Sequence, residues 1–85
     1  MKIRRTRRFK KDYQKLSTDI QRRTDEKLRL LLLDRRYPSL RSHRVRGVPG
    51  LWELSVTRNY RVIFEIERDC YVLLGVGPHD ILDRF

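Results

Sequence analysis

The sequence predicts an α+β fold in which two N-terminal helices pack on a mostly antiparallel, four-stranded sheet. Three runs rich in β-branched and aromatic residues, separated by short polar breaks, predict an antiparallel meander over residues 51–56, 60–66 and 70–76. Apolar residues at helical spacing precede these runs and predict the two covering helices. With 85 residues the chain is long enough for one modest core, so residues 1–85 are expected to form a single domain.

The N-terminal part of the chain predicts one short strand and one short helix. Residues 1–6 can form the fourth strand, in which Ile3 is the only firm apolar residue. Phe9, Tyr13 and Leu16 then recur at i, i+4 and i+7, which gives a short helix one apolar stripe.

A second helix is predicted to have Thr18 as its N-cap, in a capping-box pattern with Gln21, and to continue to about Arg35. Its buried stripe is expected to comprise Ile20, Thr24, Leu28, Leu31 and Leu32. Leu30 and Leu33 widen this stripe, so the C-terminal end of the helix should be the more deeply buried one. An irregular basic loop over residues 39–49 follows the helix and leads into the sheet.

Parity within the meander decides which residues share a face of the sheet. A three-residue loop at residues 57–59 pairs Leu54 with Val62 and keeps one face of the first hairpin apolar. The same register makes Ser55 the direct cross-strand neighbour of Arg61 on the other face.

The second hairpin extends this face. A loop at residues 67–69 would pair Arg61 with Gly75. The face away from the helices is then expected to gather Ser55, Arg61, Gly75, Gly77 and His79. Because glycine has no side chain, a ligand could approach the backbone closely there.

The composition favours an anionic partner. Lysine and arginine number 21 against 11 aspartates and glutamates, for a net charge of +10, which attracts nucleic acid or an acidic protein, although charge alone could simply keep a small domain soluble. The single cysteine, Cys70, excludes an internal disulfide and a cysteine-based zinc site, so neither a metal nor another cofactor is expected. No apolar run long enough to span a membrane and no signal peptide is present, so the chain is expected to be cytoplasmic, without a membrane partner.

Two histidines could serve metal-free cleavage of RNA. That reaction needs a base for the ribose 2′-hydroxyl, an acid for the leaving 5′-oxygen and cations for the phosphorane. His43 lies in the basic loop and His79 at the end of the last strand, while Arg46 and Arg61 could bind phosphate. Equally, His79 could hydrogen-bond a carbonyl or Asp80, and Arg61 could pair with Glu53.

The C-terminal residues predict a final helical turn. Asp80 is expected to be its N-cap, and Ile81 and Phe85 are expected to lie on the body of the domain.

Five segments together resemble the RelE/ParE toxin superfamily over essentially the whole chain. They are Phe-Lys-Lys-Asp-Tyr at 9–13, His-Arg-Val-Arg-Gly at 43–47, Gly-Leu-Trp-Glu-Leu at 50–54, Asn-Tyr-Arg-Val-Ile-Phe-Glu-Ile at 59–66 and Gly-Val-Gly-Pro-His-Asp at 75–80. The resemblance implies a RelE-like microbial RNase fold and a toxin of a toxin–antitoxin pair. RelE-like branches cut mRNA in the ribosomal A site without a metal, whereas ParE-like members inhibit DNA gyrase.

The resemblance also implies roles for individual residues. His43, Arg61 and His79 fall at positions that are catalytic in nuclease branches, and Arg46 matches a phosphate-binding residue. Arg44, Arg58 and Ser55 complete the predicted RNA-binding set. Three departures are present. Ser55 stands where active nucleases often have arginine or histidine, and Asn59 replaces an aspartate used in one branch. The tyrosine or phenylalanine often found just after the histidine is absent.

The sequence therefore predicts a toxin that acts as a ribosome-dependent, metal-independent endoribonuclease and cleaves A-site mRNA through attack of the 2′-hydroxyl on the adjacent phosphate. A ParE-like gyrase inhibitor and an inactive RNA- or ribosome-binding homologue are the alternatives. The expected partners are a cognate antitoxin, mRNA and the ribosome, with an oligomeric toxin–antitoxin complex.

Overall fold

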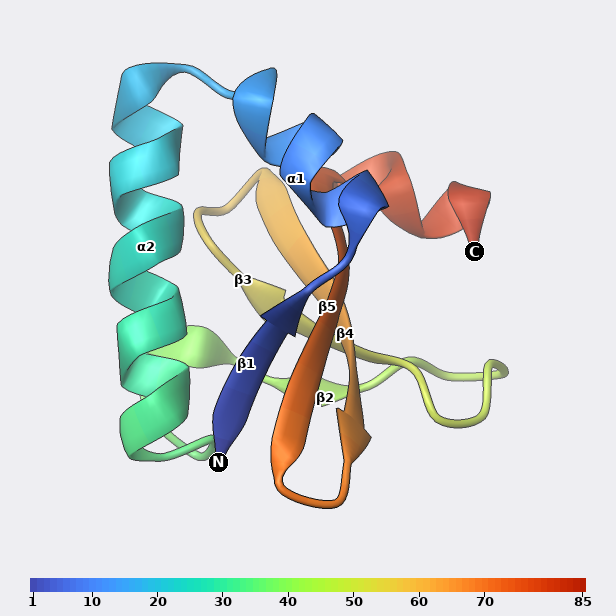
Figure 1. Ribbon diagram of the computed structural model, residues 1–85. Helices are drawn as coiled ribbons and strands as arrows, with labels where there is room; N and C mark the ends of the chain where they lie inside the picture. Colours follow the sequence, from blue (N-terminus) through green and yellow to red (C-terminus); the bar gives the residue numbers. More distant parts are fainter.

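A computed structural model describes all of residues 1–85 and confirms the α+β class (Figure 1). In chain order the elements are β1 (Lys2–Arg5), α1 (Arg7–Gln14), α2 (Thr18–Leu33), the 3-10 helix η1 (Pro38–Leu40), β2 (His43–Arg44), β3 (Trp52–Ser55), β4 (Tyr60–Glu67), β5 (Cys70–Pro78) and the 3-10 helix η2 (His79–Arg84). The sheet has five strands and not the predicted four, because two residues of the predicted basic loop form β2.

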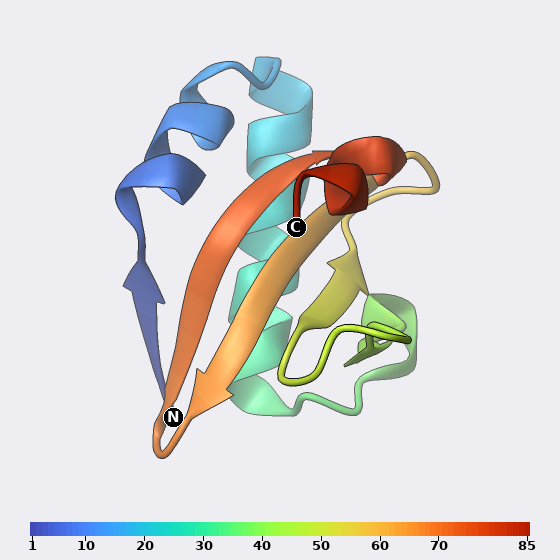
Figure 2. The ribbon, with the colours of Figure 1, turned by 90° about the vertical axis from the view of Figure 1, so that its right-hand side faces the viewer.

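The strands lie in the order β1-β5-β4-β3-β2. Neighbouring strands are antiparallel except β1, which runs parallel to β5 at one edge. The helices α1 and α2 cover one face, while η2 lies against the other face near the end of β5 (Figure 2). None of the helices is long and apolar enough to cross a membrane.

The register of the first hairpin agrees with the prediction. Leu54 pairs with Val62, and Ser55 pairs with Arg61. This register places the apolar residues of both strands toward the helices, where Leu54, Val62 and Phe64 are fully buried. The exclusion of apolar surface from water therefore determines the pairing.

The predicted register of the second hairpin is wrong. A two-residue turn, and not a three-residue loop, joins Glu67 to its partner Cys70. A bulge next to Ile63 then shifts the pairing once more, so that Arg61 lies opposite Gly77 and not Gly75. The two shifts add up to two residues, and because side chains alternate with a period of two, Gly75 and Gly77 stay on the predicted face.

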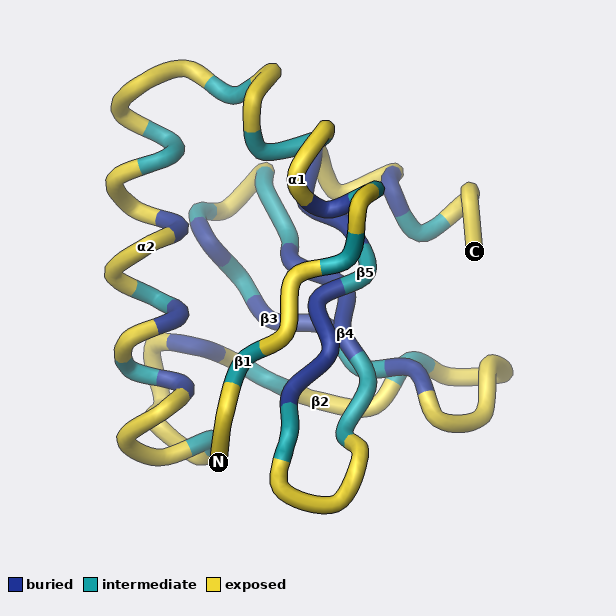
Figure 3. The backbone as a smooth tube through the Cα atoms, in the orientation of Figure 1, coloured by how far each residue is buried: buried dark blue, intermediate teal, exposed yellow.

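The prediction for α2 also needs two corrections at its ends. Ser17, and not Thr18, is the N-cap, and its Oγ accepts a hydrogen bond from the Ile20 backbone N–H at 3.2 Å. Leu32 does not belong to the buried stripe and Leu33 does not widen it, since they are 45% and 72% exposed. The outward-facing side of α2 is exposed along its length (Figure 3), because the helix packs on the sheet through one stripe that includes Leu28 and Leu31.

The chain's own C-terminus fills the space above the two glycines. A Cβ atom on Gly77 would lie 3.2 Å from Ile81 Cδ1, and one on Gly75 would lie 3.0 Å from Asp12 Oδ2. Ile81 is buried, as predicted, in a small cluster with Leu51 and Ile63. The glycines thus admit η2 and α1, and the expected open approach for a ligand is not there.

The start and end of η2 differ in part from the prediction. Pro78 and not Asp80 occupies the N-cap position, without a side-chain cap. Phe85 is 36% exposed, and the guanidinium of Arg8 lies 4.2 Å from its ring centroid. A cation–π contact to α1 thereby anchors the end of the chain.

Candidate functional site

A buried carboxylate on β3 joins two of the predicted site residues. Glu53 Oε1 lies 3.6 Å from His43 Nε2 and 3.4 Å from Arg61 Nε. His43 reaches it from β2 and Arg61 from β4, and only 11% of the Glu53 side chain is exposed. An ionised carboxylate buried to this degree needs a cationic partner, which Arg61 supplies from the neighbouring strand.

The imidazole of His43 is oriented by two oxygen atoms. Its Nδ1 lies 2.7 Å from the Arg41 carbonyl oxygen. Because a carbonyl oxygen only accepts hydrogen bonds, Nδ1 is the donor, and Nε2 faces Glu53. With 58% of its side chain exposed, His43 is accessible to a substrate while the ring is held in place.

Arg61 holds the turn between β3 and β4. Its Nη1 donates to the backbone carbonyl oxygens of Thr57, Arg58 and Tyr60 at 2.8, 2.9 and 3.2 Å. The side chain is 22% exposed. Its Nη2 makes no hydrogen bond within the chain, so part of the guanidinium fork remains available to an anion.

A polar cavity of about 300 Å³ lies beside Arg61. Four cations line it, namely Lys27, Arg41, Arg58 and Arg61. The hydroxyl-bearing side chains of Ser39, Ser55 and Thr57 complete its polar wall. Cations and hydroxyl donors without an acidic side chain are suited to binding a phosphate group.

His79 lies apart from His43. Its backbone N–H donates to the Asn59 carbonyl oxygen at 2.7 Å, whereas its ring makes no hydrogen bond or ion pair. The strands β4 and β3 separate β5 from β2, so the strands that carry or precede the two histidines are about 14 Å apart. Arg61, on β4, lies between them.

The remaining predicted RNA-binding residues point elsewhere. Arg44 pairs across the sheet with Trp52, and its guanidinium lies 5.4 Å from the Trp52 ring centroid, on the face opposite to His43. Arg46 is exposed in the loop after β2 and makes no hydrogen bond or ion pair. Only Ser55 and Arg58 of the predicted RNA-binding set share a cavity with Arg61.

The sequence predicts Glu53 only as an alternative partner of Arg61, and it does not predict Lys27, Ser39 or Arg41 as site residues. Parity could have identified Glu53, since it shares the face of Ser55 and stands between two cationic strands. No pattern in the sequence could have placed Lys27, because α2 is brought to this cavity only by the packing of the helix on the sheet.

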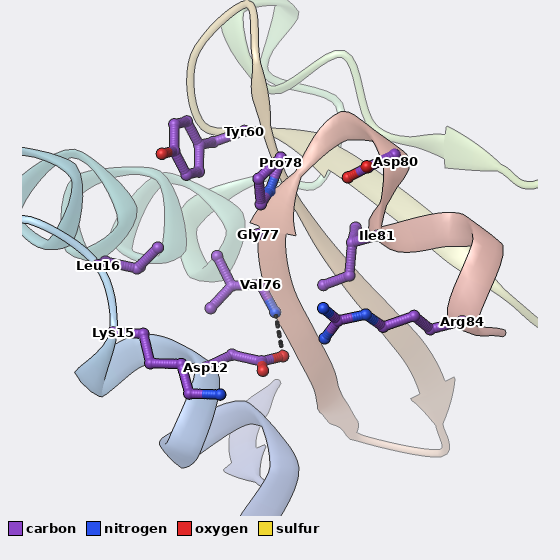
Figure 4. Close-up of a pocket in the computed structure, with 10 residues that line it drawn as sticks. All are labelled: Asp12, Lys15, Leu16, Tyr60, Val76, Gly77, Pro78, Asp80, Ile81 and Arg84. Carbon is purple, nitrogen blue, oxygen red and sulfur yellow. Dashed lines mark hydrogen bonds between the residues drawn. The ribbon is translucent and has the colours of Figure 1, made fainter.

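A second cavity, of about 260 Å³, lies between α1 and η2 and contains neither histidine (Figure 4). Asp12 Oδ2 accepts a hydrogen bond there from the Val76 backbone N–H at 3.2 Å. Lys15 and Arg84 reach the same cavity from α1 and η2. The hydrogen bond of Asp12 fastens α1 to β5.

Comparison with known proteins decides the family. The model of the ParE toxin of type II toxin–antitoxin systems matches residues 3–82. This chain belongs to the ParE toxin family. It is thus a toxin of a toxin–antitoxin system, as the resemblance implied. None of the curated protein sequences matches it.

Solved structures show the same fold as this toxin. A YoeB/ParE toxin from Agrobacterium tumefaciens superposes with a TM-score of 0.79 at 15% identity, over 93% of this chain and 99% of that one. An archaeal RelE–RelB complex from Pyrococcus horikoshii gives 0.76 at 18% identity, over 94% and 96%. The DinJ–YafQ complex from E. coli gives 0.71 at 21% identity, over 94% of each chain.

Proposed function

We propose that the toxin is a ribosome-dependent, metal-independent endoribonuclease that cleaves mRNA in the A site. The observation that carries this proposal is the cluster of His43, Glu53 and Arg61 beside a cavity lined by four cations. The cluster offers a proton acceptor, and the cavity offers a place for the scissile phosphate.

The proposed chemistry begins at His43. Its Nε2 takes the proton of the ribose 2′-hydroxyl, and the carboxylate of Glu53, 3.6 Å away, stabilises the imidazolium that forms. The 2′-oxygen then attacks the adjacent phosphorus, and the bond to the 5′-oxygen of the next nucleotide breaks. Arg58, Lys27 and the free Nη2 of Arg61 stabilise the negative charge of the phosphorane.

The leaving 5′-oxygen needs a proton, and His79 is assigned to supply it. It is the only other histidine of the chain. It follows the residue that pairs with Tyr60, and Arg61 lies between its strand and that of His43. A phosphate bound over Arg61 would therefore have one histidine on each side.

Mapping of mRNA 5′ ends tests the proposal. Defined mRNA is translated in an extract with the wild-type toxin, His43→Gln, His79→Gln or Arg61→Ala. Codon-positioned cuts are expected with wild type and a loss of at least about 100-fold for each variant. Arg29→Gln removes an exposed charge on α2 that makes no hydrogen bond or ion pair, and it should cut normally. Wild-type toxin that stops translation and leaves the mRNA intact would exclude the nuclease.

Inhibition of DNA gyrase is the second candidate. Two observations favour it, namely the match to the ParE family model and the use of Arg61 Nη1 for three internal hydrogen bonds. Supercoiling by purified gyrase in the presence of the toxin separates the two candidates. The nuclease proposal expects unchanged supercoiling.

An acidic antitoxin is the proposed partner. Structures similar to this toxin occur in complexes with RelB and DinJ. The net charge of +10 would attract a negatively charged segment. Expression of the toxin in the cytoplasm is expected to arrest growth, and co-expression of the neighbouring reading frame is expected to relieve this arrest. Sedimentation of the purified complex would give its oligomeric state.

A further inference from the structure

A cavity of about 320 Å³ lies on the other side of β2 and β3 from His43, between the end of α2 and η1. Arg35, Arg36 and Arg41 line it together with the aromatic rings of Tyr37 and Trp52. No acidic residue lines it. We propose that this cavity binds one nucleotide of single-stranded RNA, with the base stacked on Tyr37 and the flanking phosphates on the arginines. The inference deepens the proposed function, since it supplies a second contact for the same RNA.

The aromatic side of the cavity is suited to a nucleobase. Tyr37 is 43% exposed, and its hydroxyl makes no hydrogen bond within the chain. An exposed ring on a basic surface offers a π-face to any base, which is how proteins bind single strands without reading their sequence. Trp52 lines the same cavity and stacks at 6.2 Å on the buried ring of Phe64, which fixes the position of the Trp52 ring.

The arginines are placed for phosphate. The guanidinium of Arg35 lies 5.2 Å from the Trp52 ring centroid, and the Arg36 side chain is 88% exposed, with only a 3.7 Å contact to Asp34. Neither guanidinium is engaged in a close ion pair. Both can therefore reach a phosphate without breaking a buried interaction.

Arg41 connects this cavity to the proposed cleavage site. It lines both the Tyr37 cavity and the cavity beside Arg61. Its backbone has φ +48°, a left-handed conformation that a non-glycine residue adopts at a cost, and its carbonyl oxygen accepts the hydrogen bond from His43. One residue thus orients the histidine and lines both cavities, so an RNA strand that passes over Arg41 would contact both.

Intrinsic fluorescence of Trp52, the only tryptophan, provides the test. The full-length toxin is titrated, without ribosomes, with a short single-stranded RNA and with an abasic strand of the same phosphate number. Saturable quenching is expected, with about tenfold tighter binding of the RNA that carries bases. Equal affinities for the two strands, or binding of an acidic peptide as tight as that of RNA, would overturn the proposal.

Four variants locate the site. Tyr37→Ala should lose the tenfold preference and keep the affinity for the abasic strand, whereas Tyr37→Phe should bind like wild type. Arg36→Gln should weaken the binding of both strands, and it should reduce the slope of the logarithm of the binding constant against the logarithm of the salt concentration by about 0.7. Arg29→Gln removes the same charge outside the cavity and should keep the base preference. A preference that survives Tyr37→Ala, checked for folding by circular dichroism, would also overturn the proposal.

The outcomes separate this inference from the proposed nuclease. If the toxin cleaves mRNA but shows no base preference in the titration, the proposed nucleotide site is excluded and the proposed nuclease activity is supported. If the toxin binds RNA in a base-dependent way but leaves translated mRNA intact, the proposed nuclease activity is excluded and the nucleotide site is supported.

Discussion

Glu53 on β3 and Arg61 on β4 are diagonal neighbours across the sheet, with Glu53 Oε1 3.4 Å from Arg61 Nε. The same guanidinium donates from Nη1 to three carbonyl oxygens of the β3–β4 turn. Arg61 thereby neutralises a buried carboxylate and closes a turn at once. Its contribution to stability and its proposed role toward phosphate come from different nitrogen atoms of one side chain.

Replacement of Arg61 by alanine should destabilise the fold. It removes three hydrogen bonds to the turn and takes away the guanidinium beside the buried carboxylate of Glu53, at a cost of about 2–4 kcal/mol in the free energy of unfolding. Denaturant unfolding measures this cost. In a double-mutant cycle with Glu53→Gln, the two residues should show a coupling of about 1–3 kcal/mol. Additive effects of the two substitutions would mean that the 3.4 Å contact between Glu53 and Arg61 does not contribute to stability.

The two glycines of β5 should respond differently to alanine. In Gly75→Ala the new Cβ would meet Asp12 Oδ2 at 3.0 Å, and the hydrogen bond from Val76 N–H to that oxygen would be disturbed. A loss of about 1–3 kcal/mol is expected. In Gly77→Ala the close atom is the flexible end of Ile81, at 3.2 Å, so the loss should be smaller. Thermal unfolding of both variants gives the order, and the reverse order would contradict the placement of α1.

The leucines at the end of α2 provide a matched pair. Leu33 is 72% exposed, so Leu33→Ala should change stability by no more than about 0.5 kcal/mol. Leu31 is 1% exposed, and Leu31→Ala should cost about 2–5 kcal/mol. Urea midpoints of the two variants decide whether α2 faces the sheet through Leu31. Similar losses for both would mean that the helix is rotated.

Asp19 should make stability depend on pH in the acid range. The hydrogen bond that Arg22 donates to the Asp19 carboxylate holds the pKa of this carboxyl below its ordinary value, and the charges of Arg23 and Arg22 act in the same direction. A lowered pKa in the folded state stabilises the protein above the unfolded pKa, and this contribution disappears as the pH falls through the folded pKa. The melting temperature of the wild type should therefore exceed that of Asp19→Asn at neutral pH, and the two should converge as the pH falls through the lowered pKa of Asp19. A difference that persists in acid would assign the effect to packing.

The proposed site was partly predictable. Alternation of apolar and polar residues was enough to place Ser55 opposite Arg61, because burial of one face allows only one register of the first hairpin. The second hairpin was not predictable in the same way, since the bulge next to Ile63 leaves no mark in the pattern of apolar residues. The basic loop likewise concealed β2, whose two residues are recognisable only from their partners Trp52 and Glu53.

The sequence by itself determined the fold class, the two covering helices, the faces of the first hairpin and the resemblance to the toxin family, because each of these depends on local periodicity or on short motifs. Only the tertiary structure decided that Glu53 lies between His43 and Arg61, and that Lys27 reaches the cavity beside Arg61. It also decided that Ile81 fills the space above Gly77. These contacts join residues far apart in the chain, and packing and charge pairing bring them together where no local pattern can.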